Sequence, residues 1–96
     1  MIKRHDAHYK QYGLTYETYQ QMVKAQNNLC AICGQPESTI EKRSGQRRRL
    51  CVDHNHDTGK TRALLCRACN MALGYLNSVA KLSSAIDYLK KYDEAI

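Results

Sequence analysis

Two Cys-x-x-Cys pairs constrain this chain more than any other feature of its sequence. Cys30 and Cys33 form the first pair, and Cys66 and Cys69 form the second. This spacing lets both sulfurs of a pair turn toward one ion, and two pairs complete a tetrahedral site of four thiolates. The 32 residues between the pairs exceed the usual zinc-ribbon spacing. The pattern therefore predicts two cysteine-bearing turns, or knuckles, with an insertion between them, although buried or redox-active cysteines are the alternative.

A structural Zn²⁺ suits a chain of this size. The protein has 96 residues and neither Trp nor Phe, so seven tyrosines with Leu, Ile and Val must fill a small core. The N-terminal segment MIKRHDAHYK has no apolar stretch typical of a secretory signal, and no run is long enough to span a membrane. We expect no membrane partner and a reducing, cytoplasmic compartment, where paired cysteines bind metals more often than they form disulfides. The fifth cysteine, Cys51, is expected to pack as a small buried residue.

The charge of the chain indicates nucleic acid as a partner. Lys and Arg number 15 against 9 Asp and Glu, which gives a net charge of +6 and a pI near 9.2. Five of these cations fall in the stretch EKRSGQRRR, residues 41–49: Lys42, Arg43, Arg47, Arg48 and Arg49. We interpret this basic arm as a grip on the DNA backbone, while a merely solvated loop is the alternative interpretation.

Periodicity and turn residues predict a mixed α+β chain. A basic helix is expected over residues 2–12, ended by Gly13, and a second helix from the N-cap Thr15 to about Gln26. The second helix would bury Tyr16, Tyr19 and Val23, and residues 33–49 are expected to form a loop or mobile arm.

The second half of the chain alternates more clearly. Strands are predicted at 50–54 and 61–65, joined by a turn at 57–60, followed by a short helix from about Cys69. A last helix over 79–94, capped by Asn77 or Ser78, carries an apolar stripe of Leu82, Ile86 and Leu89.

The insertion ends in Asp53-His54-Asn55-His56, and Asn70 directly follows the last cysteine of the second pair. A hard cation such as Mg²⁺ prefers oxygen ligands, which Asp53 and the Asn70 amide offer. A neutral imidazole beside that cation can accept a proton from water. Together these parts suffice to hydrolyse a phosphodiester. The alternatives are a turn with chance histidines, and a structural protein in which His54 or His56 binds zinc.

The order C-x-x-C, DHNH, TGKTRALLC-x-x-CN and Leu73-Gly74 resembles the HNH (ββα-metal) nucleases, and more narrowly the phage recombination endonuclease VII family. The resemblance covers roughly residues 8–76 and includes the segment YGLTYETYQQMVKAQNNLCAICG, residues 12–34. It implies a single domain over residues 1–96 with a small zinc-stapled ββα-metal (HNH/His-Me finger) core and flanking helices. Its parts would be an N-terminal helical segment (1–28), the zinc site and core (29–76) and a C-terminal helix (77–96).

The resemblance also implies roles for individual residues. Asp53 and Asn70 would hold a catalytic Mg²⁺ or Mn²⁺, and His54 would be the general base. His56 would contact the scissile phosphate or support the site, and Arg62 would face that phosphate. The zinc ligands would be the four paired cysteines, Cys30, Cys33, Cys66 and Cys69.

Two departures limit what the resemblance implies. Met71, Ala72, Leu73 and Gly74 follow Asn70, where the junction-resolving members carry an acidic residue. Those members also have a long C-terminal region that builds an intertwined dimer, whereas this chain ends at Ile96. We therefore expect a metal-dependent DNA endonuclease or nickase in the cytoplasm of a bacterial host, with a homodimer left open. The alternative function is a non-catalytic zinc-ribbon module that binds nucleic acid, which would need no hard-metal ligands beside a free imidazole.

Overall fold

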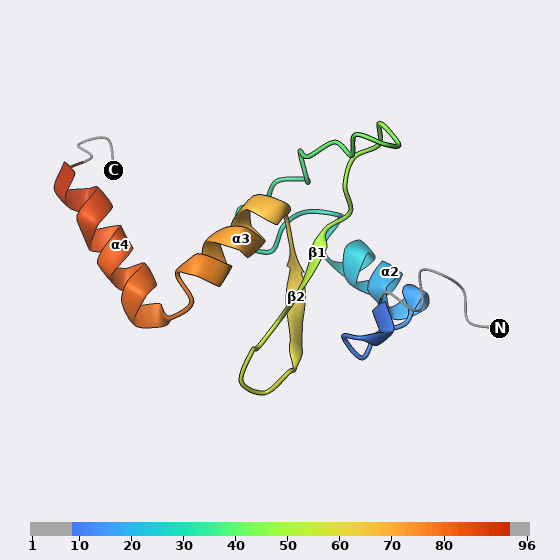
Figure 1. Cartoon of the computed structure of the whole chain (residues 1–96), viewed down its shortest axis with the longest axis horizontal. Helices are drawn as coiled ribbons and strands as arrows, with labels where there is room; N and C mark the ends of the chain where they lie inside the picture. The colour runs from blue at the N-terminus through green and yellow to red at the C-terminus, as the bar shows by residue number, and fades with distance from the viewer. Residues whose placement is uncertain (1–8, 93–96) are drawn as a thin grey trace.

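A two-stranded antiparallel hairpin lies between two helices, and a long loop arches over one end of it (Figure 1). The computed structural model describes residues 9–92, and within them the order is α2 (Tyr16–Ala25), β1 (Cys51–His54), β2 (Thr61–Leu65), α3 (Arg67–Tyr75) and α4 (Val79–Tyr92). The predicted α+β class is confirmed at this level. The expected helix over 2–12 falls mostly outside the described residues.

Helix α2 begins and ends where the sequence predicts. The side chain of Thr15 accepts a hydrogen bond from the backbone N–H of Thr18, and the Thr18 hydroxyl oxygen accepts one from the backbone N–H of Thr15. At the other end Asn27 and Asn28 have φ of 55° and 57°, in the left-handed region that asparagine tolerates and a helix does not. The chain therefore leaves the helix at this pair and turns toward the first knuckle.

The core lies where α2 packs on the hairpin. Tyr19 is fully buried, stacks on Tyr9 with ring centroids 4.4 Å apart, and donates its hydroxyl to the Leu50 carbonyl at 2.7 Å. Burial raises the pKa of Tyr19 to about 12. The buried set comprises Tyr9, Tyr19, Cys30, Leu50, Val52, Leu64, Leu65 and Cys66. Tyr16 and Val23 pack against it, as predicted from their spacing on the helix.

One glutamine side chain ties the end of α2 to the hairpin. Gln26 accepts from the Leu64 backbone N–H at 2.9 Å and donates to the Leu64 carbonyl at 3.0 Å. It also donates to the carbonyl of Leu29. The side chain thus pairs with β2 as a neighbouring strand would, and it fixes the strand beside the first cysteine pair.

The two strands are out of simple register at one place. Val52 pairs with Leu64 and His54 pairs with Thr61, so the single residue Asp53 lies opposite two residues of β2. This is a β-bulge, which bends the strand and re-aims its side chains. The strands otherwise match the predicted ranges, except that β1 begins at Cys51 rather than at residue 50.

Helix α3 begins at Arg67, two residues before the predicted start at Cys69. The difference has a local cause, because Cys66 acts as the N-cap and its sulfur accepts from the Cys69 backbone N–H at 3.5 Å. Cysteine is not among the usual N-cap residues, so the sequence did not indicate this start. Helix α3 packs against both strands.

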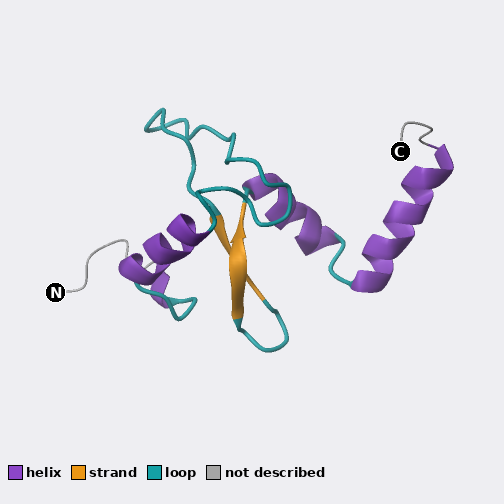
Figure 2. Ribbon diagram, turned by 180° about the vertical axis from the view of Figure 1, so that it is seen from behind, coloured by secondary structure: helices purple, strands orange, loops and turns teal. Residues whose placement is uncertain are grey.

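Helix α4 lies apart from the hairpin, beyond the end of α3 (Figure 2). It begins after Ser78, whose hydroxyl accepts from the Lys81 backbone N–H at 3.1 Å, which confirms one of the two predicted caps. Within residues 9–92 it packs on none of the other helices or strands. Its predicted stripe is consequently exposed, with Ile86 at 52% and Leu89 at 53%. Among the described helices, none is both long and apolar enough to cross a membrane.

Candidate active site and metal centre

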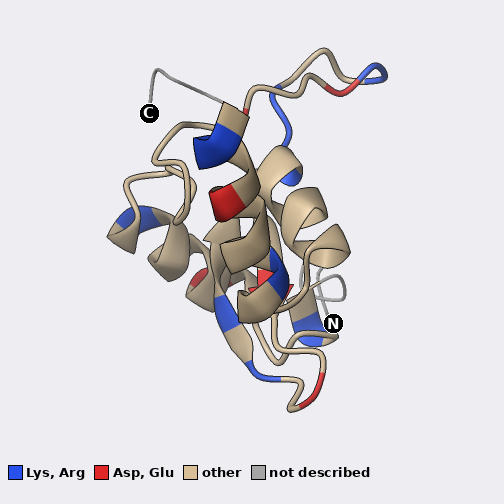
Figure 3. Ribbon diagram, turned by 90° about the vertical axis from the view of Figure 1, so that its left-hand side faces the viewer, with Lys and Arg blue, Asp and Glu red and all other residues tan. Residues whose placement is uncertain are grey.

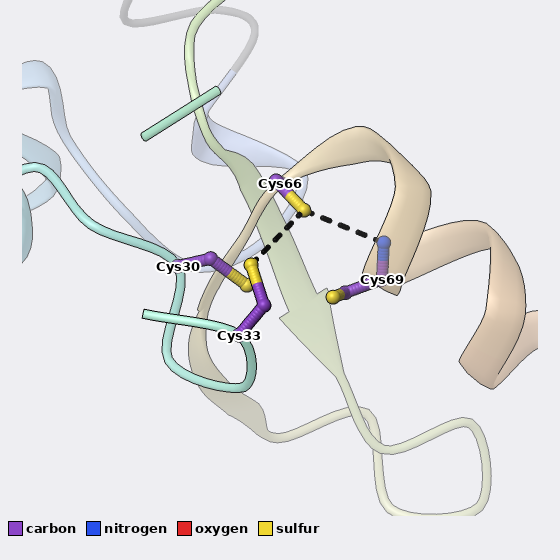
Figure 4. A group of neighbouring side chains, drawn as sticks. All are labelled: Cys30, Cys33, Cys66 and Cys69. Carbon is purple, nitrogen blue, oxygen red and sulfur yellow. Dashed lines mark hydrogen bonds between the residues drawn. The ribbon is translucent and has the colours of Figure 1, made fainter. Parts of the chain in front are cut away.

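The four paired cysteines converge on one point (Figure 4). Cys30 and Cys33 come from the turn after α2, Cys66 follows β2, and Cys69 lies in the first turn of α3. Their sulfur atoms all lie within 4.8 Å of one another, and the Cys33 and Cys66 sulfurs are 3.9 Å apart. Tetrahedral zinc with Zn–S bonds of ≈ 2.3 Å requires sulfurs about 3.8 Å apart. The cluster therefore has the dimensions of a four-thiolate metal site.

No histidine joins this cluster. In the part of the chain that the structure describes, these four cysteines are the only group of three or more Cys, His, Asp or Glu side chains placed to share an ion. The interpretation in which His54 or His56 ligates zinc is not supported by this arrangement.

The thiols of the cluster differ in how readily they ionise. Burial raises the pKa of Cys30, but hydrogen bonds from backbone N–H groups, including that of Ile32 at 3.4 Å, outweigh it and lower the pKa to about 6. Burial and hydrogen bonds to the other thiols raise the pKa of Cys69 to about 12. Cys30 therefore ionises easily, and its negative charge opposes ionisation of the other thiols. A divalent cation at the centre would remove this repulsion between thiolates.

Glu37 is a residue that the sequence analysis missed. Its side chain is buried, accepts from the Arg67 backbone N–H at 2.6 Å, and accepts from the Ser38 and Thr39 backbone N–H groups at 3.0 and 3.1 Å. It therefore holds the loop after the first knuckle against the first residue of α3. The sequence carried no signal for this contact beyond an acidic residue four positions after Cys33, because Arg67 lies 30 residues further along the chain.

A second centre lies on the other side of α3, where a cavity of about 440 Å³ opens beside the hairpin. Asp53 from β1, His56 from the hairpin loop, Arg62 from β2 and Asn70 from α3 all line it. The segment from Leu76 to Val79 closes its far side. The fold thus brings together three of the four predicted catalytic residues and Arg62, from four different parts of the chain.

Asp53 is buried at the wall of this cavity and is held by one side chain. The Arg62 Nε donates to Asp53 Oδ2 at 2.6 Å, and Arg62 Nη2 donates to Oδ1 at 3.0 Å. This is a two-pronged arginine–carboxylate pair, the most directional form of ion pair. The bulge accounts for it, because the extra residue on β2 places Arg62 beside Asp53.

His54 lies next to the cavity and does not line it. Its ring packs between the rings of Tyr12 and His56, with centroid distances of 5.6 and 4.8 Å. The two histidines of the motif therefore form a contiguous pair, with His56 exposed in the cavity and His54 half-buried behind it. The amide oxygen of Asn55 accepts from the Asp57 and Thr58 backbone N–H groups and fixes the loop that carries His56.

The basic arm projects from the body of the protein. Figure 3 shows its cations at the tip and along the returning limb of the loop. An isolated pairing of Ile40 with Arg47 holds the two limbs together. Arg49 turns inward, since its Nη1 donates to the Tyr9 hydroxyl at 2.8 Å and its guanidinium carbon lies 5.7 Å from the Tyr9 ring centroid. Arg47 and Arg48 are exposed.

Comparison with known proteins shows the family of this chain. The family model for recombination endonuclease VII matches residues 4–91, which is nearly the whole chain. The chain belongs to this family. The match extends on both sides of the predicted core and includes the residues of α2 and most of those of α4.

Two phage proteins are similar to the chain over most of its length. The Gene 59 protein of Mycobacterium phage D29 is 42% identical over 82 residues, which cover 83% of this chain and 46% of the phage protein. The Gene 59 protein of Mycobacterium phage L5 is 38% identical over 80 residues, covering 81% and 44%. The chain thus spans less than half the length of these relatives. No solved structure matches it.

Proposed function

We propose that this protein is a metal-dependent DNA endonuclease or nickase of the HNH (ββα-metal) type, which hydrolyses phosphodiester bonds. The observation that carries the proposal is the cavity in which Asp53, His56, Arg62 and Asn70 meet beside His54. Membership of the recombination endonuclease VII family supports the same chemistry. A module that only binds nucleic acid would have no use for a buried carboxylate, an amide and an imidazole around one cavity, with a second imidazole packed against the first.

The donor set of the cavity suits a hard divalent cation. Asp53 on β1 provides a carboxylate and Asn70 on α3 an amide oxygen, and hard cations prefer such oxygen ligands. When bound there, Mg²⁺ or Mn²⁺ would supply positive charge to a phosphate oxygen and to the leaving 3′-oxygen. The four-cysteine cluster, made only of soft sulfur ligands, is proposed to hold a structural Zn²⁺ instead.

The protein's own side chains divide the remaining work. His54 takes a proton from the attacking water at a ring nitrogen, for which it must be neutral. His56, in contact with the His54 ring and exposed in the cavity, orients it and contacts the scissile phosphate. Arg62, which is half exposed, lies where its guanidinium can face that phosphate.

The arm is proposed to hold DNA at a distance from the chemistry. Arg47 and Arg48 are exposed and would contact phosphates together with Lys42 and Arg43, whereas Arg49 also holds the arm to Tyr9. Contacts of this kind add affinity and salt dependence without reading sequence. If Arg47→Gln with Arg48→Gln left the salt dependence of DNA binding unchanged, the arm would be only a solvated loop.

Nicking of supercoiled plasmid DNA tests the proposal, with zinc-loaded protein in Mg²⁺, Mn²⁺ or EDTA. Wild-type protein should nick in either metal and stop in EDTA. His54→Ala should be slower by about 10²–10⁴, the usual contribution of a general base, while DNA affinity and zinc content stay near wild type.

His56→Ala is the matched control, because it removes the same ring two residues away. It should lower the rate less than His54→Ala does. If His54→Ala nicks at the wild-type rate and His56→Ala does not, His56 is the base. If no variant and no metal gives nicking while the protein binds DNA, the non-catalytic module is the correct function.

A further inference from the structure

Arg62 occupies the oxygen atoms that the proposed cation requires. Both oxygens of the Asp53 carboxylate accept hydrogen bonds from it, one from Nε at 2.6 Å and one from Nη2 at 3.0 Å. Among residues 9–92 this is the only salt bridge between acidic and basic side chains. A divalent cation at Asp53 would coordinate at least one of these oxygens, so it would compete with Arg62 for the negative charge of the carboxylate.

The two partners of this pair differ in their exposure to solvent. The Asp53 side chain is 11% exposed, whereas the Arg62 side chain is 49% exposed and projects into the cavity. Asp53 is also fixed by its place opposite the bulge. The carboxylate is therefore the stationary partner, and the guanidinium is the group that can leave, since water can replace the hydrogen bonds that it gives up.

Electrostatics gives the exchange its direction. Arg62 is the only Lys or Arg side chain among the residues that line the cavity. While it is paired, its positive charge neutralises Asp53 and repels a second cation. When a divalent cation takes the carboxylate, the same repulsion acts on the guanidinium and favours its departure.

We propose that Arg62 is an exchangeable counter-ion of Asp53. It positions the carboxylate in the cation-free protein, competes with the divalent cation for it, and moves away from the carboxylate when the cation binds. The inference rests on the proposed function for the cation at Asp53, and it adds that Arg62 sets the affinity of that site. A merely structural latch would keep both hydrogen bonds whether or not the cation is present.

Calorimetric titration of Mn²⁺ into zinc-loaded protein, without DNA, tests the competition. Arg62→Gln should bind Mn²⁺ at least about fivefold more tightly than wild type, the lower end of typical coupling between two sites. Lys60→Gln is the matched control. Lys60 lies two residues before Arg62 and carries the same charge, but its side chain does not line the cavity. This variant should stay within about twofold of wild type. Equal or weaker Mn²⁺ binding by Arg62→Gln would overturn the proposal.

A spectroscopic measurement on the wild-type protein tests the movement itself. The Arg62 Nε–Hε resonance in ¹H–¹⁵N spectra should report the hydrogen bond to Asp53 and shift toward the position of a free arginine as Mg²⁺ saturates the site. A resonance that does not move at saturating Mg²⁺ would mean that Arg62 stays on Asp53, and the proposal would be wrong. Should Arg62→Gln fail to fold, as judged by zinc content and circular dichroism, this spectrum decides alone.

Failure of the proposed function is distinguishable from failure of the exchange. Asp53→Asn should abolish Mn²⁺ binding at this site. If it binds as well as wild type, the cation lies elsewhere, and both the cation assignment and the exchange are wrong. If the Mn²⁺ affinities and the Arg62 resonance behave as expected but no DNA is nicked, the exchange stands and the nuclease activity does not.

Discussion

Glu37 and Asp53 are both buried acids, yet their hydrogen-bond donors differ in kind. Glu37 accepts from three backbone N–H groups, which cannot leave without unfolding the loop or the first turn of α3. Asp53 accepts from one half-exposed side chain, which can be replaced. A carboxylate held by backbone N–H groups stabilises the fold. A carboxylate held by a half-exposed guanidinium can exchange that partner for another cation.

Replacing Glu37 should therefore lower the stability of the zinc-loaded protein. Glu37→Gln keeps the shape but puts an amide N–H₂ against backbone donors, so we expect a loss of about 1.5–3 kcal/mol in free energy of unfolding at neutral pH. Urea unfolding at constant zinc measures it. Ser38→Ala is the control, because Ser38 donates to Glu37 through its backbone N–H and not through its side chain. No loss in Glu37→Gln would contradict the assignment.

The same carboxylate predicts how stability responds to acid. Burial raises the pKa of Glu37, but the backbone N–H groups of Arg67 and Thr39 outweigh it and lower the pKa below its usual value. Its contribution is therefore complete above the ordinary glutamate pKa of about 4.3, and is lost as pH falls below that value through the lower pKa of the folded state. The stability difference between wild type and Glu37→Gln should shrink over that range.

Helices α3 and α4 follow each other closely but play different parts. Helix α3 packs on both strands and carries Cys69 and Asn70, so it joins the metal centre to the cavity. Helix α4 packs on no other described helix or strand, and only its first residues reach the cavity. The sequence of α4 alone determines its apolar stripe, whereas burial of the stripe depends on whether another element packs against it.

Substitutions in the two regions should differ accordingly. Leu64 in β2 is fully buried, so Leu64→Ala should cost about 2–5 kcal/mol. Ile86→Ser on α4 changes helix propensity little and should stay within about 0.5 kcal/mol. Thermal unfolding at fixed zinc and protein concentration compares them. A large loss from Ile86→Ser would show that the α4 stripe is covered in solution.

At the scale of the whole molecule, the metal centre is the junction of the fold. Its cysteines lie after α2, at the end of β2 and in α3, so one ion would join all three elements. Within residues 9–92 the buried core that accompanies it has eight residues, two of which are cysteines of the cluster. A core of this size supplies little stability alone, and metal binding is then strongly coupled to folding.

Zinc content and folding should therefore change together. Protein dialysed free of loose metal should contain about one zinc per chain, and a strong chelator should abolish its cooperative unfolding transition. Cys66→Ser should unfold or aggregate the protein. Cys51→Ser removes a half-buried sulfur outside the cluster and should be mild. A zinc-free protein that unfolds cooperatively at the wild-type temperature would show that the cluster is not the staple.

The sequence was sufficient for features that depend on near neighbours. The Cys-x-x-Cys spacing predicted the cluster, the N-cap Thr15 predicted the start of α2, and alternation predicted the two strands. Capping, helical periodicity and knuckle turns are decided within a few residues, so they can be read along the chain. The motif Asp53-His54-Asn55-His56 likewise predicted a catalytic metal site in this part of the chain.

Only the tertiary structure decided which of these groups touch. The bulge that sets Asp53 against Arg62, the reach of Glu37 to the start of α3 and the early start of that helix at Cys66 all depend on contacts between distant segments. The same holds for the separation of His54 from the cavity and for the exposure of the α4 stripe. An alternating strand pattern does not specify a shift of one residue in register, and an apolar stripe does not specify its partner, because both are settled by packing in three dimensions.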